Sequence, residues 1–233
     1  MTTVLTKIKE FVSVDSRWTD VFDKPIETSM RKHIYANDEI TLFSGDHLPI
    51  LLEQAILTEA ITDEDYLRFV DLLEVEESFG YITLDATDGA LVEDGNYSYE
   101  WFNGYSHTGT GGQFAAEFYF YANKKNYKSL YGCNIEGAMR YAFYRDECSG
   151  DGIFKKTWNP PLLDTTLHTG SDYIDFLKQQ VDQYIRGLDM QTKLRSAMRT
   201  AGNGGGQRVT LSAAKERLEN RKKRLAAKQA ISN

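Results

Sequence analysis

Residues 97–121 read Tyr97-Ser-Tyr-Glu-Trp-Phe-Asn-Gly-Tyr-Ser-His-Thr-Gly-Thr-Gly-Gly-Gln-Phe-Ala-Ala-Glu-Phe-Tyr-Phe-Tyr121, and they dominate the predicted fold. The first run, 97–102, alternates and then meets Asn103-Gly104, the strongest short signal for a β-hairpin. In the second run, 113–121, alternate residues are apolar and would share one face of a strand. The sequence therefore predicts an α+β fold with an antiparallel sheet centred on a 97–121 hairpin.

Four segments carry apolar residues at helical spacing and are predicted to cover one face of that sheet: 49–60, 63–74, 135–145 and 172–199. Residues that cap helices, such as Thr62 and Asn134, precede two of them. Residues 5–36 contain further short amphipathic pieces, because Ile8, Phe11 and Val12 share one helical face. We therefore expect the first third of the chain to be mostly helical.

The domain organisation follows from the glycine-rich stretch Ala201-Gly-Asn-Gly-Gly-Gly-Gln207. Beyond it, residues 208–233 hold eight Lys/Arg against two Glu, whereas the whole chain has a net charge of −7. The sequence predicts an acidic globular body at 1–200, a hinge at 201–207 and a basic helical arm at 208–233. Modules of opposite charge usually face different partners.

The arm is predicted to dock on a neighbouring subunit or another anionic partner. Its contact residues would be the basic side chains and one narrow leucine line, namely Arg208, Lys215, Arg217, Arg221, Lys222, Lys223, Arg224, Lys228, Leu211, Leu218 and Leu225. Three alternatives stay open: contact with nucleic-acid phosphates, packing on the chain's own acidic body, and a solvated tail.

Five aromatic residues are predicted to form a protein interface: Tyr97, Tyr99, Trp101, Tyr119 and Tyr121. Tyrosine-rich faces are common at such interfaces. The alternative, a stacking platform for single-stranded bases, usually comes with a positively charged groove. Few basic residues lie nearby in the sequence, so the protein interface is the preferred interpretation.

No catalytic residue, metal site or cofactor is predicted. The acidic loop at 85–94 lacks the spacing of a calcium-binding loop. The four histidines are scattered, and Cys133 and Cys148 lack the C-x-x-C spacing. The turn Gly109-Thr-Gly-Gly112 does not match the phosphate-binding P-loop pattern.

These observations favour a non-enzymatic interaction or assembly protein, in the style of a virus or phage particle component, that associates with itself or another protein. The alternative is a metal-dependent phosphodiester hydrolase, or a nucleic-acid-binding protein, that uses residues 208–233 for phosphate contacts. The N-terminal sequence lacks the pattern of a signal peptide, and no apolar stretch reaches the length of a membrane span. The expected location is the cytoplasm or an assembled particle, with no membrane contact.

Overall fold

The computed structural model describes residues 2–20, 22–72, 79–95, 97–101, 104–124, 134–158, 169–195 and 211–232. The chain divides into two compact units, and the division falls within helix α1. We call residues 1–50 and 79–168 the sheet unit, and residues 51–78 and 169–233 the helical unit. Antiparallel sheets and helices together confirm the predicted α+β class.

The sheet unit contains a five-stranded antiparallel sheet in the order β11-β2-β1-β10-β9. Its strands are β1 (Val4–Lys7), β2 (Phe11–Asp15), β9 (Ser98–Trp101), β10 (Tyr105–Thr108) and β11 (Ile153–Thr157). The central strand β1 pairs with β2 on one side and with β10 on the other. The N-terminal residues therefore lie in the middle of the sheet.

A second antiparallel sheet has the order β5-β6-β7-β8. Its strands are β5 (His33–Ala36), β6 (Glu39–Gly45), β7 (Phe79–Asp85) and β8 (Leu91–Asp94). A short ribbon, β3 (Trp18–Thr19) and β4 (Pro25–Ile26), lies between β2 and β5 in the chain.

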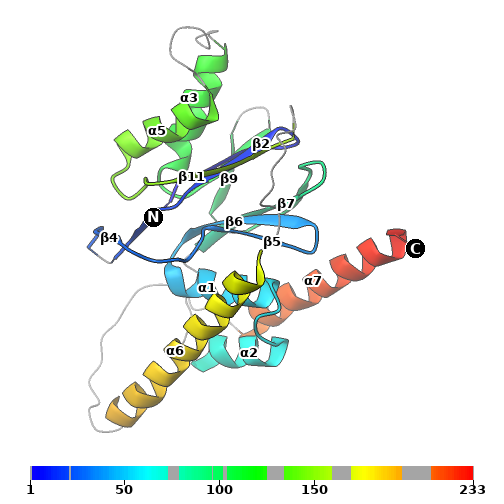
Figure 1. Cartoon of the computed structure of the whole chain (residues 1–233). Helices are drawn as coiled ribbons and strands as arrows, with labels where there is room; N and C mark the ends of the chain where they lie inside the picture. Colours follow the sequence, from blue (N-terminus) through cyan, green and yellow to red (C-terminus); the bar gives the residue numbers. More distant parts are fainter. Residues whose placement is uncertain are drawn as a thin grey trace. The chain divides into compact units, whose positions relative to one another are not determined.

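A core of alternating aliphatic residues joins the two sheets, as Figure 1 shows for the stacked strands. Val4, Val12 and Val14 come from the first sheet, and Ile40, Leu42, Ile82 and Leu84 come from the second. Each is at most 1% exposed. Burial of a side chain of this size contributes about 1.5–3 kcal/mol, so this layer is a main source of stability for the sheet unit.

Helices α3 (Gly112–Lys124) and α5 (Ile135–Arg145) cover the other face of the first sheet (Figure 1). The small residues Ala115 and Ala116 let α3 approach Leu5 and Phe11 closely. Asn134 caps α5, because its side-chain oxygen accepts a hydrogen bond from the Gly137 amide at 2.7 Å.

The helical unit contains most of α1 (His47–Leu57), together with α2 (Asp63–Leu72), α6 (Ser171–Arg195) and α7 (Leu211–Ser232). Thr62 caps α2 by accepting from the Asp65 amide at 3.1 Å. In the interior, the Tyr173 hydroxyl donates to Gln54 Oε1 at 2.7 Å. Across the described residues, no helix has the length and apolar character needed to cross a bilayer.

The predicted hairpin is present but shorter than expected, since β9 and β10 end at Thr108. Asn103 lies outside the described residues. The expected strand at 113–121 is wrong, because this run lies in helix α3. Ala115, Ala116 and Ala122 form its buried stripe at helical spacing. Aromatic residues at alternate positions between them gave the run the pattern of a strand.

The expectation of a mostly helical first third is also wrong for residues 4–45, which form six strands. Both faces of β1 and β2 are buried, so their sequences read as continuous apolar and small polar runs, without strict alternation. The helices expected at 49–60, 63–74, 135–145 and 172–199 correspond to α1, α2, α5 and α6, with residues 73–74 and 196–199 outside the described residues. Of these four, only α5 lies wholly within the sheet unit, where it covers the first sheet together with α3.

Candidate active site around Thr2

Thr2 and Thr3 lead into the central strand β1, and both are completely buried. The peptide between them is held on both sides. Its N–H, on Thr3, donates to Asp15 Oδ1 at 2.8 Å, and its carbonyl, on Thr2, accepts from the Gly111 amide at 3.2 Å. The Thr2 hydroxyl itself has no hydrogen-bond partner among the described residues.

Asp15, the last residue of β2, is the acceptor at the centre of this site. Besides the Thr3 amide, it accepts from the Gly150 amide at 3.1 Å and from the Arg17 amide at 3.2 Å. Both of its oxygens also lie 3.2 Å from Lys32 Nζ. The hairpin of β1 and β2 brings Asp15 to Thr3, since the Asp15 amide donates to the Thr3 carbonyl at 3.2 Å.

Lys32 and Asp15 form an ion pair whose two side chains are fully buried. Burial lowers the pKa of the Lys32 ammonium, and the Asp15 carboxylate offsets part of that shift. The ammonium also lies 5.2 Å from the Trp18 ring centre, and the Trp18 indole N–H donates to the Met30 carbonyl at 2.9 Å. A lysine with a lowered pKa gives up its proton more readily than an ordinary lysine, which makes it a candidate base.

A glycine turn, residues 109–112, packs against Thr2 and Thr3. Gly109 has φ +81°, and a Cβ there would lie 2.1 Å from the Thr2 carbonyl oxygen. A Cβ on Gly111 would lie 1.9 Å from Thr3 Oγ1. Only glycine allows this approach, and the turn leads directly into α3.

A network of hydroxyl groups on Asp146 closes the site. Asp146 Oδ2 accepts from Ser149 Oγ at 2.7 Å and from Thr110 Oγ1 at 2.6 Å. Ser149 Oγ in turn accepts from Thr3 Oγ1 at 2.8 Å. Residues far apart in the sequence thus meet around the start of β1. The arrangement offers a buried hydroxyl, a buried lysine and a carboxylate that orients the lysine.

The sequence-based prediction identified none of these residues. Position 15 is one of many acids, and Thr2 carries no local motif. The one visible signal was the pair of glycines around Thr110, which was interpreted as a simple turn. Cys148, beside Ser149, is buried and donates to Asp23 Oδ1 at 3.3 Å. Cys133 lies outside the described residues.

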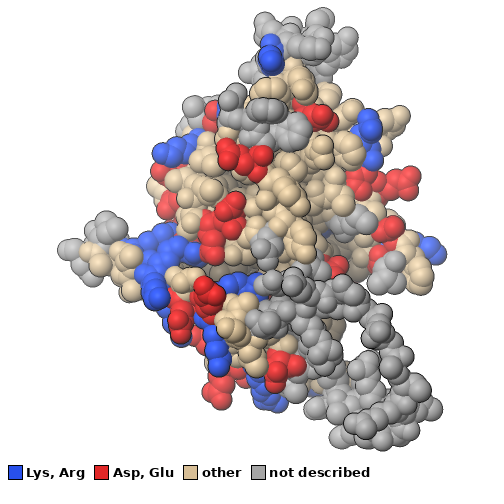
Figure 2. Space-filling view, turned by 180° about the vertical axis from the view of Figure 1, so that it is seen from behind, with Lys and Arg blue, Asp and Glu red and all other residues tan. Residues whose placement is uncertain are grey.

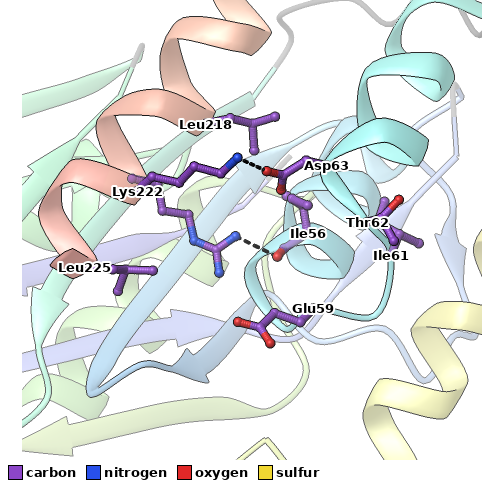
Figure 3. Close-up of a pocket in the computed structure, with 9 residues that line it drawn as sticks. Ile56, Glu59, Ile61, Thr62, Asp63, Leu218, Lys222 and Leu225 are labelled. Carbon is purple, nitrogen blue, oxygen red and sulfur yellow. Dashed lines mark hydrogen bonds and ion pairs between the residues drawn. The ribbon is translucent and has the colours of Figure 1, made fainter. Parts of the chain in front are cut away.

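The predicted arm residues lie on α7, which contacts α1 and α2 within the helical unit (Figure 3). Arg221 donates to the carbonyls of Ile56 and Leu57 at 2.6 and 2.9 Å, and Lys222 pairs with Asp63. Arg217 lies 3.7 Å from Glu53. These contacts place the basic side chains at the C-terminal end of α1, where the helix dipole favours cations, and beside the acidic side chains at the start of α2.

The other arm residues differ in exposure. Leu218 is buried, Arg224, Leu225 and Lys228 are half-buried, and Lys215, Lys223 and Leu211 are exposed. Figure 2 shows a group of Lys and Arg side chains that lies next to acidic ones on the face that is drawn. Arg208 and the hinge at 201–207 lie outside the described residues.

The predicted interface aromatics fall into different environments. Tyr97, Tyr99 and Tyr121 are 55%, 58% and 47% exposed. Tyr119 instead packs on Phe11, with ring centres 5.0 Å apart. The side chain of Trp101 is outside the described part of the chain. Within the described residues, neither the acidic loop at 85–94 nor the histidines belong to a group of three side chains that could hold a metal ion.

No family model matches the chain, and no curated protein matches its sequence. Among solved structures, the chain resembles eukaryotic HslV from Trypanosoma brucei, with a TM-score of 0.41 and 21% identity, over 67% of this chain and 98% of that one. It also resembles BPH from Thiobacillus denitrificans in complex with epoxomicin, with a TM-score of 0.44 and 10% identity. That match covers 67% of this chain and 97% of the other.

The prediction of a non-enzymatic interaction or assembly protein is wrong against these comparisons, since the solved structures that the chain resembles are HslV and BPH. The prediction of a viral or phage particle component is wrong for the same reason. The neighbours give no support to phosphodiester hydrolysis or to a nucleic-acid partner either. The chemistry open to the chain depends on the geometry around Thr2.

Proposed function

We propose that the chain hydrolyses amide bonds with the Thr2 hydroxyl as its nucleophile. The observation that carries this proposal is a buried Thr2 hydroxyl without a described hydrogen-bond partner, on a peptide that is bonded to the Asp15–Lys32 pair. An unsatisfied buried polar group costs about 1–3 kcal/mol, and groups of this kind often have a functional role.

A threonine hydroxyl needs a base to become a nucleophile. Two groups of this site could act as that base: Lys32, whose pKa is lowered by burial, and the α-amine of Thr2 itself. The second requires that whatever precedes Thr2 in the chain be removed. Asp15 holds Lys32 in place and stabilises its ammonium form after proton transfer.

The reaction would proceed in two stages. Thr2 Oγ1 attacks the carbonyl carbon of the substrate amide while its proton passes to the base. The base then returns the proton to the leaving amine, which leaves an ester on Thr2. In the second stage, water attacks the ester under the same base, and the acid product and free Thr2 are released.

The negative charge on the carbonyl oxygen needs nearby donors. Backbone amides at the start of α3 suit this role, because they lie at the positive end of the helix dipole, whereas the Gly111 and Gly112 amides are already bonded to the Thr2 and Gly109 carbonyls. Asp146, Thr110 and Ser149 would fix the turn at 109–112 and Thr3 through their hydrogen bonds.

Peptide hydrolysis by three variants tests the proposal. Thr2→Ala is expected to abolish release of the fluorophore from a set of fluorogenic peptide amides, and Thr2→Ser to retain part of the rate. Thr3→Ala is the matched control, because it changes the neighbouring threonine, and it is expected to reduce the rate without abolishing it. Equal rates for wild type and Thr2→Ala would exclude Thr2 as the nucleophile.

Self-association of the enzyme is part of the proposal, with the exposed Tyr97, Tyr99 and Tyr121 as candidate contact residues. Exposed tyrosines favour protein interfaces. Light scattering of the wild type and of a variant with these three tyrosines changed to Ser tests it. A lower mass for the variant supports the assignment, and an unchanged oligomer contradicts it.

A further inference from the structure

The loop at 147–151, which carries Ser149 and Gly150 into the site, is bonded to one side chain of the β2–β3 connection, Arg17. The Arg17 guanidinium donates to Asp151 Oδ1 from Nε at 3.2 Å and from Nη2 at 2.9 Å. Its Nη1 donates to the Glu147 carbonyl at 3.0 Å. One side chain thus binds both ends of the loop.

The backbone on either side of Arg17 is bonded to the same loop. The Arg17 amide donates to the Gly150 carbonyl at 3.2 Å, and the Ser16 amide donates to the Gly152 carbonyl at 3.0 Å. The contact requires glycine at position 150, because a Cβ there would lie 2.5 Å from Arg17 Cζ. Gly150 has φ +157°, so a side chain would also strain the backbone.

Two catalytic contacts depend on the position of this loop. The Gly150 amide donates to the Asp15 carboxylate, and Ser149 Oγ lies between Thr3 and Asp146. A loop that moved away would leave Asp15 with one donor fewer and would release Thr3. The planar guanidinium suits this task, because its donors have a fixed fork geometry that lysine cannot reproduce.

We infer that Arg17 is a positioning residue that holds the 147–151 loop against Asp15, so that Gly150 and Ser149 stay in the Thr2 site. The inference rests on the proposed function for its effect on catalysis. The contacts of the loop can be tested without it.

The first test uses amide hydrogen exchange of the Gly150 N–H, which the Asp15 carboxylate protects. Arg17→Ala is expected to speed this exchange by about tenfold or more. Arg140→Ala is the matched control, because it removes a guanidinium that pairs with Glu136 at 2.8 Å on the exposed face of α5. Unchanged Gly150 exchange in Arg17→Ala would overturn the inference.

The second test uses peptide hydrolysis and chemical rescue. Arg17→Ala is expected to lower kcat by about 10- to 100-fold, with little change in KM, since misplacement of a site by about 1 Å costs up to 100-fold. The Arg17 side chain is 26% exposed, so added guanidinium ion at millimolar concentration is expected to enter and restore part of kcat. Sodium chloride at the same concentration is the control.

The results separate the two proposals. Wild-type hydrolysis that persists in Thr2→Ala refutes the proposed function, and the exchange experiment still decides the contact of Arg17. Hydrolysis that requires Thr2 but is equal in wild type and Arg17→Ala overturns the positioning role. Rescue by guanidinium without rescue by sodium supports it, because a loss of overall folding would not respond to a small cation. Equal effects of the two salts overturn it.

Discussion

Replacement of Lys32 by Met tests the buried ion pair at the centre of the site. Methionine fills a similar space without charge, and it leaves the Asp15 carboxylate buried without its cation. Removal of one partner of a buried pair costs about 3–5 kcal/mol. Asp15 keeps three backbone N–H donors at 2.8, 3.1 and 3.2 Å, so we expect a loss near 3 kcal/mol.

The assay is urea unfolding followed by tryptophan fluorescence. Trp18 and Trp158 both belong to the sheet unit, and the Trp18 ring lies 5.2 Å from Lys32 Nζ, so the signal reports on this unit. The double variant Lys32→Met/Asp15→Asn removes both charges. It is expected to be more stable than Lys32→Met alone, with a coupling energy of about 1–3 kcal/mol.

Two results would refute this reasoning. One is a loss below about 1 kcal/mol for Lys32→Met, which is the range of exposed pairs. The other is simple additivity of the two single variants. If Lys32 is the base, peptide hydrolysis is expected to be lost in both Lys32→Met and the double variant, whereas hydrolysis that persists in both would assign the base to the α-amine of Thr2.

Four further predictions concern Lys32, Gly109 and Arg221. The rate of hydrolysis is expected to rise with pH as Lys32 loses its proton, at a pH below the ordinary lysine pKa of 10.5. A pH–rate profile of Lys32→Arg should lack this rise. Since the folded pKa of Lys32 is lowered, the unfolded chain binds more protons between that pKa and 10.5, so the free energy of unfolding is expected to rise with pH there in wild type but not in Lys32→Met. Gly109→Ala is expected to abolish hydrolysis, because its Cβ would meet the Thr2 carbonyl oxygen at 2.1 Å. Gly104→Ala is the control in the same kinetic assay, because Gly104 also has a positive φ but its Cβ would meet nothing within 4 Å. Arg221→Ala is expected to destabilise the helical unit by about 1–3 kcal/mol, because two carbonyls at the end of α1 lose their donor, and urea unfolding followed by circular dichroism measures this loss; no loss would contradict the contact.

The sequence predicted the helices well and the strands unevenly. Helices α1, α2, α5 and α6 have clear apolar stripes, and Thr62 and Asn134 mark two of their starts. Strands β1 and β2 are buried on both faces, so period-two alternation is absent there. Helix α3 combines a glycine-rich start with a run of aromatics, and tertiary packing of its alanines decides its conformation.

The candidate site was hidden from sequence reasoning for a different reason. Its residues come from five separate segments, around positions 2, 15, 32, 110 and 149, and each is an ordinary residue in its own context. Only the pairing of β1 with β2 and the close approach at Gly109 bring them together. The proposed chemistry depends on the burial of these side chains and on the contacts between them, and a short sequence motif cannot show either.

The most direct test of the account is the site of acylation. A peptide β-lactone transfers its acyl group to a nucleophilic hydroxyl without a leaving group, so the protein gains the whole mass of the reagent. Intact-mass and fragment spectra are expected to show one adduct on the Thr2 hydroxyl, and none in Thr2→Ala. An adduct on another residue, or equal labelling of Thr2→Ala, would contradict the assignment of Thr2 as the nucleophile.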